Sequence, residues 1–123
     1  MKFCWSTLYV NDMEESLKFY EEIIGLPVNQ RFKAGSGVEI AFLGEGETKI
    51  ELICDDSKKE INIDPDISWG FRVESLEETM KFLVDRGINI IAGPIEPNPG
   101  IRFIYIPDPN GMKIQLVEEK NMQ

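Results

Sequence analysis

The sequence predicts an α+β fold of two tandem β-α-β-β-β modules, whose curved mixed sheets form a half-barrel cavity. The main observation is an internal repeat. Residues 7–20 reappear in outline at 70–83, and residues 49–52 return at 113–116, so the offsets are 63 and 64. Two matches at nearly the same offset, one near each end of a half, indicate two copies of one module. A duplicated module places equivalent side chains around a shared, pseudo-symmetric site.

Each half opens with a predicted strand followed by a helix. The strands are expected at residues 4–10 and 68–73. Both helix starts show the capping-box pattern, a short polar residue three positions before a glutamate: Asp12 with Glu15, and Ser75 with Glu78. Glycines stand where the two helices are expected to stop, at Gly25 and Gly87. The apolar stripes along these helices are interpreted as core.

Three strands are predicted after each helix. In the first half they are at residues 28–33, 38–43 and 48–54, and in the second half at residues 88–92, 101–106 and 112–118. A proline-rich loop is expected at 94–100, and an Asn-Gly turn at 108–111. The whole chain, residues 1–123, is expected to form one domain, divided into module one (about 1–56), a polar linker (about 57–66) and module two (about 67–121).

The composition limits the class of partner. The net charge of −9 and the pI near 4.5 argue against nucleic-acid binding, which needs clustered Lys and Arg. No signal peptide and no apolar run of membrane-spanning length is visible, so a cytoplasmic protein is expected. Cys4 and Cys54 are expected to be reduced thiols in the core, on the side facing the helices.

The layout resembles the vicinal oxygen chelate superfamily, which includes glyoxalase I, bleomycin-resistance proteins, fosfomycin-resistance proteins and extradiol dioxygenases. The resemblance covers nearly the whole chain and is most specific in the closing segment. It is carried by Val10-Asn11-Asp12, Phe19-Tyr20, Gly25-Leu26 and Asp108-Pro109-Asn110-Gly111-Met112-Lys113-Ile114-Gln115-Leu116. It implies the glyoxalase/bleomycin-resistance fold, although one fold carries many unrelated activities.

In metal-using members, the resemblance implies four ligands from the opening and closing strands of the modules, usually two His with two Glu or with Glu and Gln. The matching positions here are Trp5, Glu51, Ser68 and Gln115, and the repeat pairs them in the same way. The chain contains no His, and an indole cannot ligate a metal. We therefore expect no metal cofactor. The alternative is one divalent ion, such as Mg²⁺, held by Glu51 and Gln115 with water.

Glu51 is the acidic residue that the repeat directs toward the cavity. It could anchor a cationic or hydrogen-bonding ligand, or act as a general base if its surroundings raised its pKa. It could equally be neutralised by Arg72 or a nearby Lys in a structural role. Arg72 could in turn receive a ligand carboxylate or phosphate, but the structural role is preferred for it.

Aromatic side chains are candidates for the cavity lining. Trp5, Thr7 and Tyr9 share one face of the first strand by alternation, and Phe103 and Tyr105 are expected on a neighbouring strand. These rings could stack on a flat or cationic ligand. Core filling is the simpler interpretation of any single ring, and Trp5 could also plug a former metal site.

Two polar residues complete the candidate set. Gln115 can both donate and accept, which suits the orientation of a ligand, although it could also be an unimportant rim residue. Ser68 has no His to activate it, so nucleophilic catalysis is not expected there.

The preferred hypothesis is a metal-free protein that binds and sequesters a small molecule, such as an amphipathic aromatic or cationic compound. A homodimer is expected, because strand edges and cavity rims need to be covered. One rival is a divalent-metal-dependent lyase or isomerase of the glyoxalase I (lactoylglutathione lyase) type. Another is a structural or regulatory domain with a plugged cavity.

Overall fold

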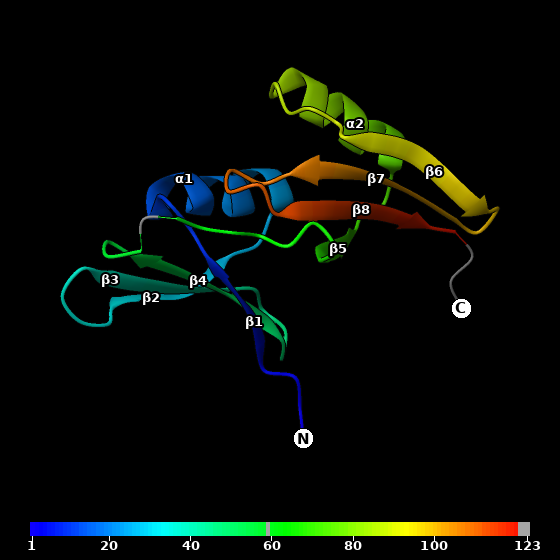
Figure 1. The fold of residues 1–123 in the computed structure, drawn as a ribbon. Coiled ribbons are helices and arrows are strands. Elements are labelled where there is room, and N and C mark those ends of the chain that lie inside the picture. The colour runs from blue at the N-terminus through cyan, green and yellow to red at the C-terminus, as the bar shows by residue number, and fades with distance from the viewer. Residues whose placement is uncertain (59, 121–123) are drawn as a thin grey trace. The chain divides into compact units, whose positions relative to one another are not determined.

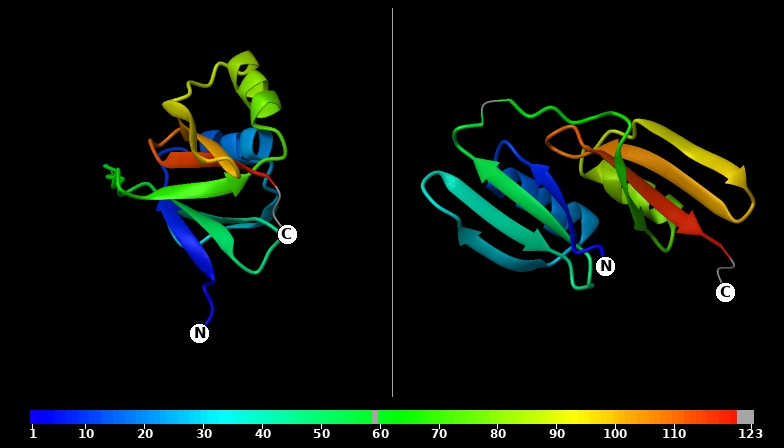
Figure 2. Two further views of the ribbon diagram at one scale, coloured as in Figure 1. Left: turned by 90° about the vertical axis from the view of Figure 1, so that its right-hand side faces the viewer. Right: turned by 60° about the horizontal axis from the view of Figure 1, so that its bottom comes forward.

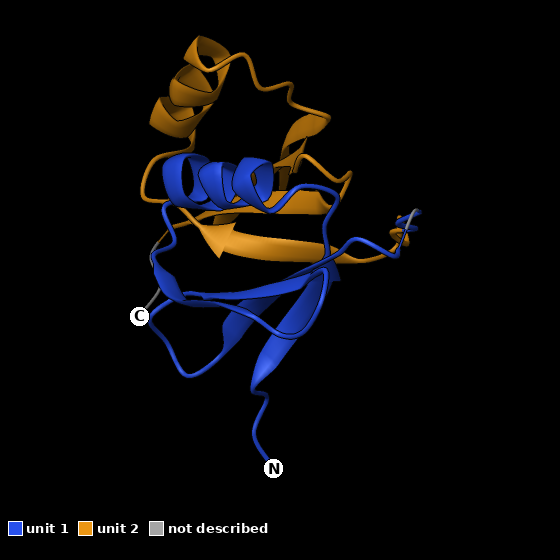
Figure 3. Ribbon diagram, turned by 90° about the vertical axis from the view of Figure 1, so that its left-hand side faces the viewer, with its two compact units in different colours: residues 1–62 blue, residues 63–123 orange. Residues whose placement is uncertain are grey.

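The computed structural model describes residues 1–58 and 60–120. The chain divides into two compact units, Met1–Asn62 and Ile63–Gln123, which are coloured separately in Figure 3. The division falls within the predicted linker. Each unit contains one four-stranded sheet, so the fold is α+β with two β-α-β-β-β modules in tandem, as the repeat predicts.

The first unit follows the predicted order of elements (Figure 1). Its elements are β1 (Trp5–Tyr9), α1 (Met13–Lys18), η1 (Phe19–Ile24), β2 (Val28–Lys33), β3 (Val38–Leu43) and β4 (Lys49–Asp55). The strand order in the sheet is β1-β4-β3-β2. Strand β1 runs parallel to β4, whereas β3 pairs antiparallel with both β4 and β2.

The second unit repeats this topology. Its elements are β5 (Ser68–Arg72), α2 (Leu76–Asp85), β6 (Ala92–Asn98), β7 (Ile101–Pro107) and β8 (Lys113–Glu119). The strand order is β5-β8-β7-β6, again with the opening strand parallel to the closing strand, and Figure 2 shows the four strands of each sheet. Among the described residues, no helix has the length and apolar character needed to cross a membrane.

The strand register repeats together with the sequence. Each opening strand is aligned with its closing strand at equivalent residues: Trp5 with Lys49, Thr7 with Glu51, Ser68 with Lys113, and Gly70 with Gln115. The offsets of 63 and 64 seen in the sequence are therefore offsets between equivalent positions in the two sheets.

One face of each sheet is buried against the helix of its own unit. In the first sheet this face carries Leu8, Ala41 and Leu52. Cys54, two residues beyond Leu52, donates its thiol to the carbonyl oxygen of Asn11 at 3.7 Å, just before α1 begins. Residues of one parity therefore form the core, and residues of the other parity lie on the open face of the sheet.

In the second sheet, alternate residues of β7 and β8 are again buried. Its buried residues are Ile104, Ile106, Ile114 and Leu116, and α2 contributes Leu76 and Leu83. The helix-side face of β8 reaches the start of α2 through Glu118, which occupies the position equivalent to Cys54.

Both predicted helix starts are capped. Asp12 Oδ1 accepts a hydrogen bond from the Glu15 N–H at 3.1 Å, and Ser75 Oγ accepts from the Glu78 N–H at 3.2 Å. Each cap satisfies a backbone donor that has no partner within the helix, and typically contributes about 1 kcal/mol.

The first helix ends differently from the prediction. Only Met13–Lys18 is α-helical, and Phe19–Ile24 forms the wider π-helix η1. The N–H groups of Gly25 and Leu26 both donate to the carbonyl oxygen of Tyr20, at 2.9 Å each. Gly25 has a φ of +88°, so the predicted glycine does end the helix, through a left-handed residue that suits glycine.

The prediction of a strand at residues 88–92 is wrong. Strand β6 spans Ala92–Asn98 instead and includes most of the segment expected to be a proline-rich loop. Because β6 is the outermost strand of its sheet, Pro94 and Pro97 need not donate to a further strand. Its pairing with β7 is also irregular, with register shifts on both sides of Ile95.

Glu118 ties the second sheet to its helix. The side chain is buried, and its Oε1 accepts a hydrogen bond of 2.8 Å from the backbone N–H of Leu76, the first residue of α2. Arg102 Nη2 lies 3.2 Å from Glu118 Oε2. The Leu76 N–H, supported by Arg102 and opposed by burial, holds the pKa of the Glu118 carboxyl below its ordinary value.

A lowered pKa in the folded state predicts a specific pH dependence. The Glu118 carboxylate stabilises the fold fully above the pKa of an unfolded glutamate, and this contribution is lost as the pH falls through the lower folded-state pKa. Replacement Glu118→Gln should therefore lower the thermal unfolding midpoint at pH 7, with a deficit that shrinks toward pH 3. The exposed Glu96 on β6 gives the control, since Glu96→Gln should leave the whole pH profile unchanged. A Glu118→Gln deficit of equal size at pH 7 and pH 3 would contradict this assignment.

Candidate functional site

The open face of the first sheet presents the residues expected from strand alternation. Trp5, Thr7 and Tyr9 lie on this face of β1, whereas Leu8 and Val10 are buried on the other. The solvent-exposed fraction is 48% for Trp5 and 38% for Tyr9. Large aromatic side chains this exposed are not filling the core, so they are available to contact another molecule.

Glu51 lies opposite Thr7 on the neighbouring strand β4. The Thr7 hydroxyl donates a 2.6 Å hydrogen bond to Glu51 Oε1, and the Glu51 side chain is half-buried. This bond fixes the orientation of the carboxylate on the open face. Arg72, suggested as a partner for Glu51, instead forms an ion pair with Glu119 on β8, with Arg72 Nη2 2.8 Å from Glu119 Oε1.

Phe42 completes an aromatic cluster that the sequence analysis missed. It lies on β3, aligned with Glu51. Its ring meets the Trp5 ring edge to face, with centroids 5.2 Å apart, and stacks on the Phe32 ring at 6.4 Å. The repeat contained the signal for Phe42, because an offset of 63 from Tyr105 leads directly to it.

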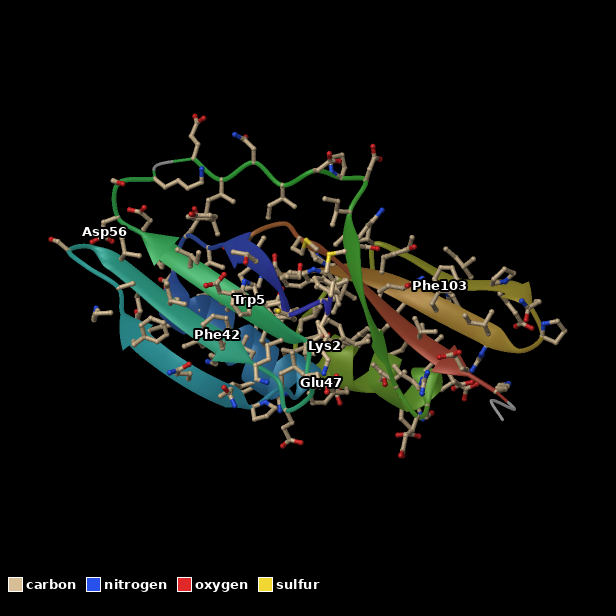
Figure 4. The ribbon with its side chains drawn as sticks, turned by 90° about the horizontal axis from the view of Figure 1, so that it is seen from below. Lys2, Trp5, Phe42, Glu47, Asp56 and Phe103 are labelled. Atoms are coloured by element: carbon tan, nitrogen blue, oxygen red, sulfur yellow. The ribbon has the colours of Figure 1, made fainter. Side chains whose placement is uncertain are left out.

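A pocket of about 530 Å³ opens beside this cluster. Figure 4 shows Trp5 and Phe42 on one side of it, with Lys2 and Glu47 close to each other. Cys4 and Lys49 also line it. Cys4 is exposed, which corrects the expectation of a core thiol, because the residue precedes β1 rather than lying within it.

Tyr9 lies further along the same face of β1. The ammonium of Lys58, from the segment after β4, lies 5.3 Å from the centre of the Tyr9 ring. A cation–π contact within the chain therefore already covers part of this ring.

The open face of the second sheet is less acidic. Gln115 Nε2 lies 3.5 Å from the hydroxyl oxygen of Tyr105, on the neighbouring strand β7. Gly70 is aligned with Gln115, and a Cβ atom there would lie 3.2 Å from Gln115 Oε1, so the glycine leaves room for the amide. The ammonium of Lys113 lies 5.0 Å from the centre of the Tyr105 ring.

The other candidate residues of the second unit belong to a different sheet from β1. Phe103 and Tyr105 are on β7, whose neighbours are β6 and β8, so the expectation that they lie on a strand next to β1 is wrong. That neighbour is β4, and the ring facing Trp5 belongs to Phe42. Ser68 is exposed at the start of β5.

The donor atoms at the four positions do not fit the metal site of the metal-using relatives. Trp5 offers an N–H that cannot ligate, and Glu51 is the one carboxylate among the four positions. Ser68 and Gln115 supply a neutral hydroxyl and a neutral amide. Among the described residues, no group of three or more His, Cys, Asp or Glu side chains could hold a metal ion.

The comparisons with known proteins identify the family. Residues 3–116 match the family model of the Glyoxalase/Bleomycin resistance protein/Dioxygenase superfamily, and the chain belongs to this superfamily. The chain is 27% identical to the uncharacterized protein YraH of Bacillus subtilis, over 94% of this chain and 97% of that protein. It is 24% identical to the lactoylglutathione lyase of Escherichia coli O157:H7, over 98% of this chain and 95% of that enzyme.

Solved structures agree with this assignment at the level of the fold. The trypanothione-dependent glyoxalase I of Leishmania major superimposes with a TM-score of 0.81 at 23% identity, covering 97% of this chain and 87% of that one. At this identity the similarity supports a shared fold of two β-α-β-β-β modules and does not extend to activity.

The exposure of Trp5 predicts that its removal has a small effect on stability. Trp5→Ala should lower the free energy of unfolding by less than the removal of a fully buried side chain does, because 48% of the Trp5 surface is already exposed and less apolar area is lost. The control is Leu52→Ala on the buried face of β4, which should cost about 2–5 kcal/mol. Urea unfolding measures both changes. Equal costs would mean that Trp5 fills the core.

Proposed function

We propose that this protein is a metal-free, small-molecule-binding member of its superfamily that sequesters its ligand. The observation that carries the proposal is the aromatic pocket on the open face of the first sheet, with exposed Trp5 at the position of a metal ligand in metal-using relatives. The proposed ligand-binding residues are Trp5, Thr7, Tyr9 and Glu51 in the first unit and, taken separately, Ser68, Arg72, Phe103, Tyr105 and Gln115 in the second unit.

The chemistry of the first unit supports binding more than catalysis. Trp5 and Phe42 offer apolar surface for stacking, and a pocket of about 530 Å³ is within the size range of small-molecule sites. Glu51 is held by Thr7 as a fixed hydrogen-bond acceptor.

The proposed setting is a cytoplasmic homodimer that binds neither nucleic acid nor a membrane. The net charge of −9 supports the exclusion of nucleic acid, because phosphate contacts require clustered cations. The strands at the sheet edges and the exposed aromatic residues support self-association.

One rival is a divalent-metal-dependent lyase of the glyoxalase I type. Its support is the similarity to lactoylglutathione lyases over nearly the whole chain. The lack of His weighs against it. The other rival, a structural or regulatory domain with a plugged cavity, requires Trp5 to fill the pocket, which its 48% exposure does not favour.

A neutral aromatic probe tests the binding proposal. N-phenyl-1-naphthylamine, whose fluorescence rises in apolar surroundings, should bind the wild-type protein with a saturable signal. Trp5→Ala should weaken this binding about tenfold, because a stacking ring contributes roughly 1 kcal/mol or more. The matched control is Phe82→Ala on α2, a half-buried ring outside the pocket. No binding, or equal weakening by both variants, would count against the proposal.

A metal titration separates the proposal from the enzyme rival. Thermal unfolding with Ni²⁺, Zn²⁺, Mn²⁺ or Mg²⁺ should show no rise in the midpoint, because Glu51 and Gln115 are too few ligands for tight binding. Glu51→Gln is the control, since it removes the one negative ligand. A rise in the wild type that disappears in Glu51→Gln, with stoichiometric metal on elemental analysis, would favour the lyase.

A further inference from the structure

The pocket of the first unit combines aromatic surface with positive charge. Three of its lining side chains are charged: Lys2, Lys49 and Glu47. Lys2 Nζ lies 3.5 Å from Glu47 Oε1, in a pair whose side chains are at least 80% exposed, so this pair is weak. The charged lining therefore has an excess of one cation in a chain whose net charge is −9.

The wall of the pocket is held in place by hydrogen bonds. The Lys49 backbone N–H donates to the Cys4 carbonyl oxygen at 3.0 Å, and the Thr48 hydroxyl donates to the Phe3 carbonyl oxygen at 2.9 Å. These bonds extend the pairing of β1 and β4 to the residues before β1. The chain from Lys2 to Cys4 is thus attached to the sheet.

Lys49 is the fixed cation of this pocket. Its ammonium donates to the Gly46 carbonyl oxygen at 2.7 Å, in the turn between β3 and β4. An ammonium has three N–H donors, so two can serve a ligand. The equivalent ammonium in the second unit, that of Lys113, lies instead over the Tyr105 ring.

Lys49 determines where an anionic group would bind in this pocket. Trp5 is aligned with Lys49 on the neighbouring strand, and Phe42 lines the same pocket with its ring 5.2 Å from that of Trp5. Glu51 is aligned with Phe42, beside the pocket lining. An anionic group would therefore lie at Lys49, because Glu51 repels an anion.

We propose that this pocket binds a flat aromatic acid. The acid group pairs with Lys49 and Lys2, and the ring stacks beside Trp5 and Phe42. This inference rests on the proposed binding function and narrows it to one ligand class. The sequence left open an aromatic or a cationic ligand. This inference favours the aromatic ligand and adds that it is an anion.

Isothermal titration calorimetry with matched one-ring probes tests the charge preference. 4-Hydroxybenzoate should bind at least about tenfold more tightly than 4-hydroxybenzylamine, which replaces the anion by a cation. Lys49→Gln should weaken 4-hydroxybenzoate about tenfold, the size expected for one charge-assisted hydrogen bond. The control is Lys81→Gln, at an exposed side chain of α2. It removes the same charge and should leave the affinity for 4-hydroxybenzoate unchanged.

Thermal unfolding of each variant checks that the fold is intact. If Lys49→Gln fails to fold, Lys2→Gln should weaken 4-hydroxybenzoate by a smaller factor.

The outcomes separate this inference from the function it rests on. Binding of N-phenyl-1-naphthylamine with no preference for the acid over the amine would overturn the inference and leave the binding function standing. Equal affinities of Lys49→Gln and Lys81→Gln for 4-hydroxybenzoate would also overturn it. If neither the one-ring probes nor the neutral dye binds, both fall together.

Discussion

The structure of each unit depends on the parallel pairing of its first and last strands. Parallel neighbours need a connection that crosses from one end of the sheet to the other, and a helix on one face begins that connection. The closing strand is thereby placed between the opening strand and its hairpin partner. One of its faces is covered by the helix and the other is open. On β4, this arrangement separates buried Leu52 from half-buried Glu51, one residue away.

The same constraint explains why the two modules can be compared residue position by residue position, although the side chains at equivalent positions differ in chemistry. Thr7 and Glu51 form a charged, hydrogen-bonded pair, whereas the equivalent Gly70 and Gln115 form a neutral arrangement in which glycine makes room for the amide. The helix-side positions differ as well, since Cys54 donates a weak thiol bond where Glu118 accepts from the start of α2. Duplication fixed the backbone positions, and the side chains then diverged within them.

Sequence patterns predicted those features that depend on local or periodic rules. The bounds of β2 and β3, both helix caps and the face carried by Trp5 follow from alternation and capping. Features that depend on tertiary neighbours were not predictable. Strand β6 contains prolines that only its edge position permits, and the π-helical turn of η1 has no signature in residue spacing. The partner of Arg72 could not be chosen because several acids were compatible with it, and only strand order selects Glu119.

The environment of Glu51 shows how a half-buried carboxylate can be stabilised on the open face of the sheet. A half-buried carboxylate without a counter-ion is unfavourable unless a hydrogen bond compensates for lost hydration. The Thr7 hydroxyl provides that bond within the same sheet, so Glu51 does not require a metal to remain in place. The Thr7 bond engages Oε1 of the carboxylate, and a carboxylate has further acceptor lone pairs, so Glu51 keeps acceptor capacity toward the open face. Two residues away, Lys49 carries the opposite charge, and its ammonium is held by a turn carbonyl. Strand β4 therefore presents an acceptor and a donor on the same face, each oriented by a hydrogen bond within the first unit.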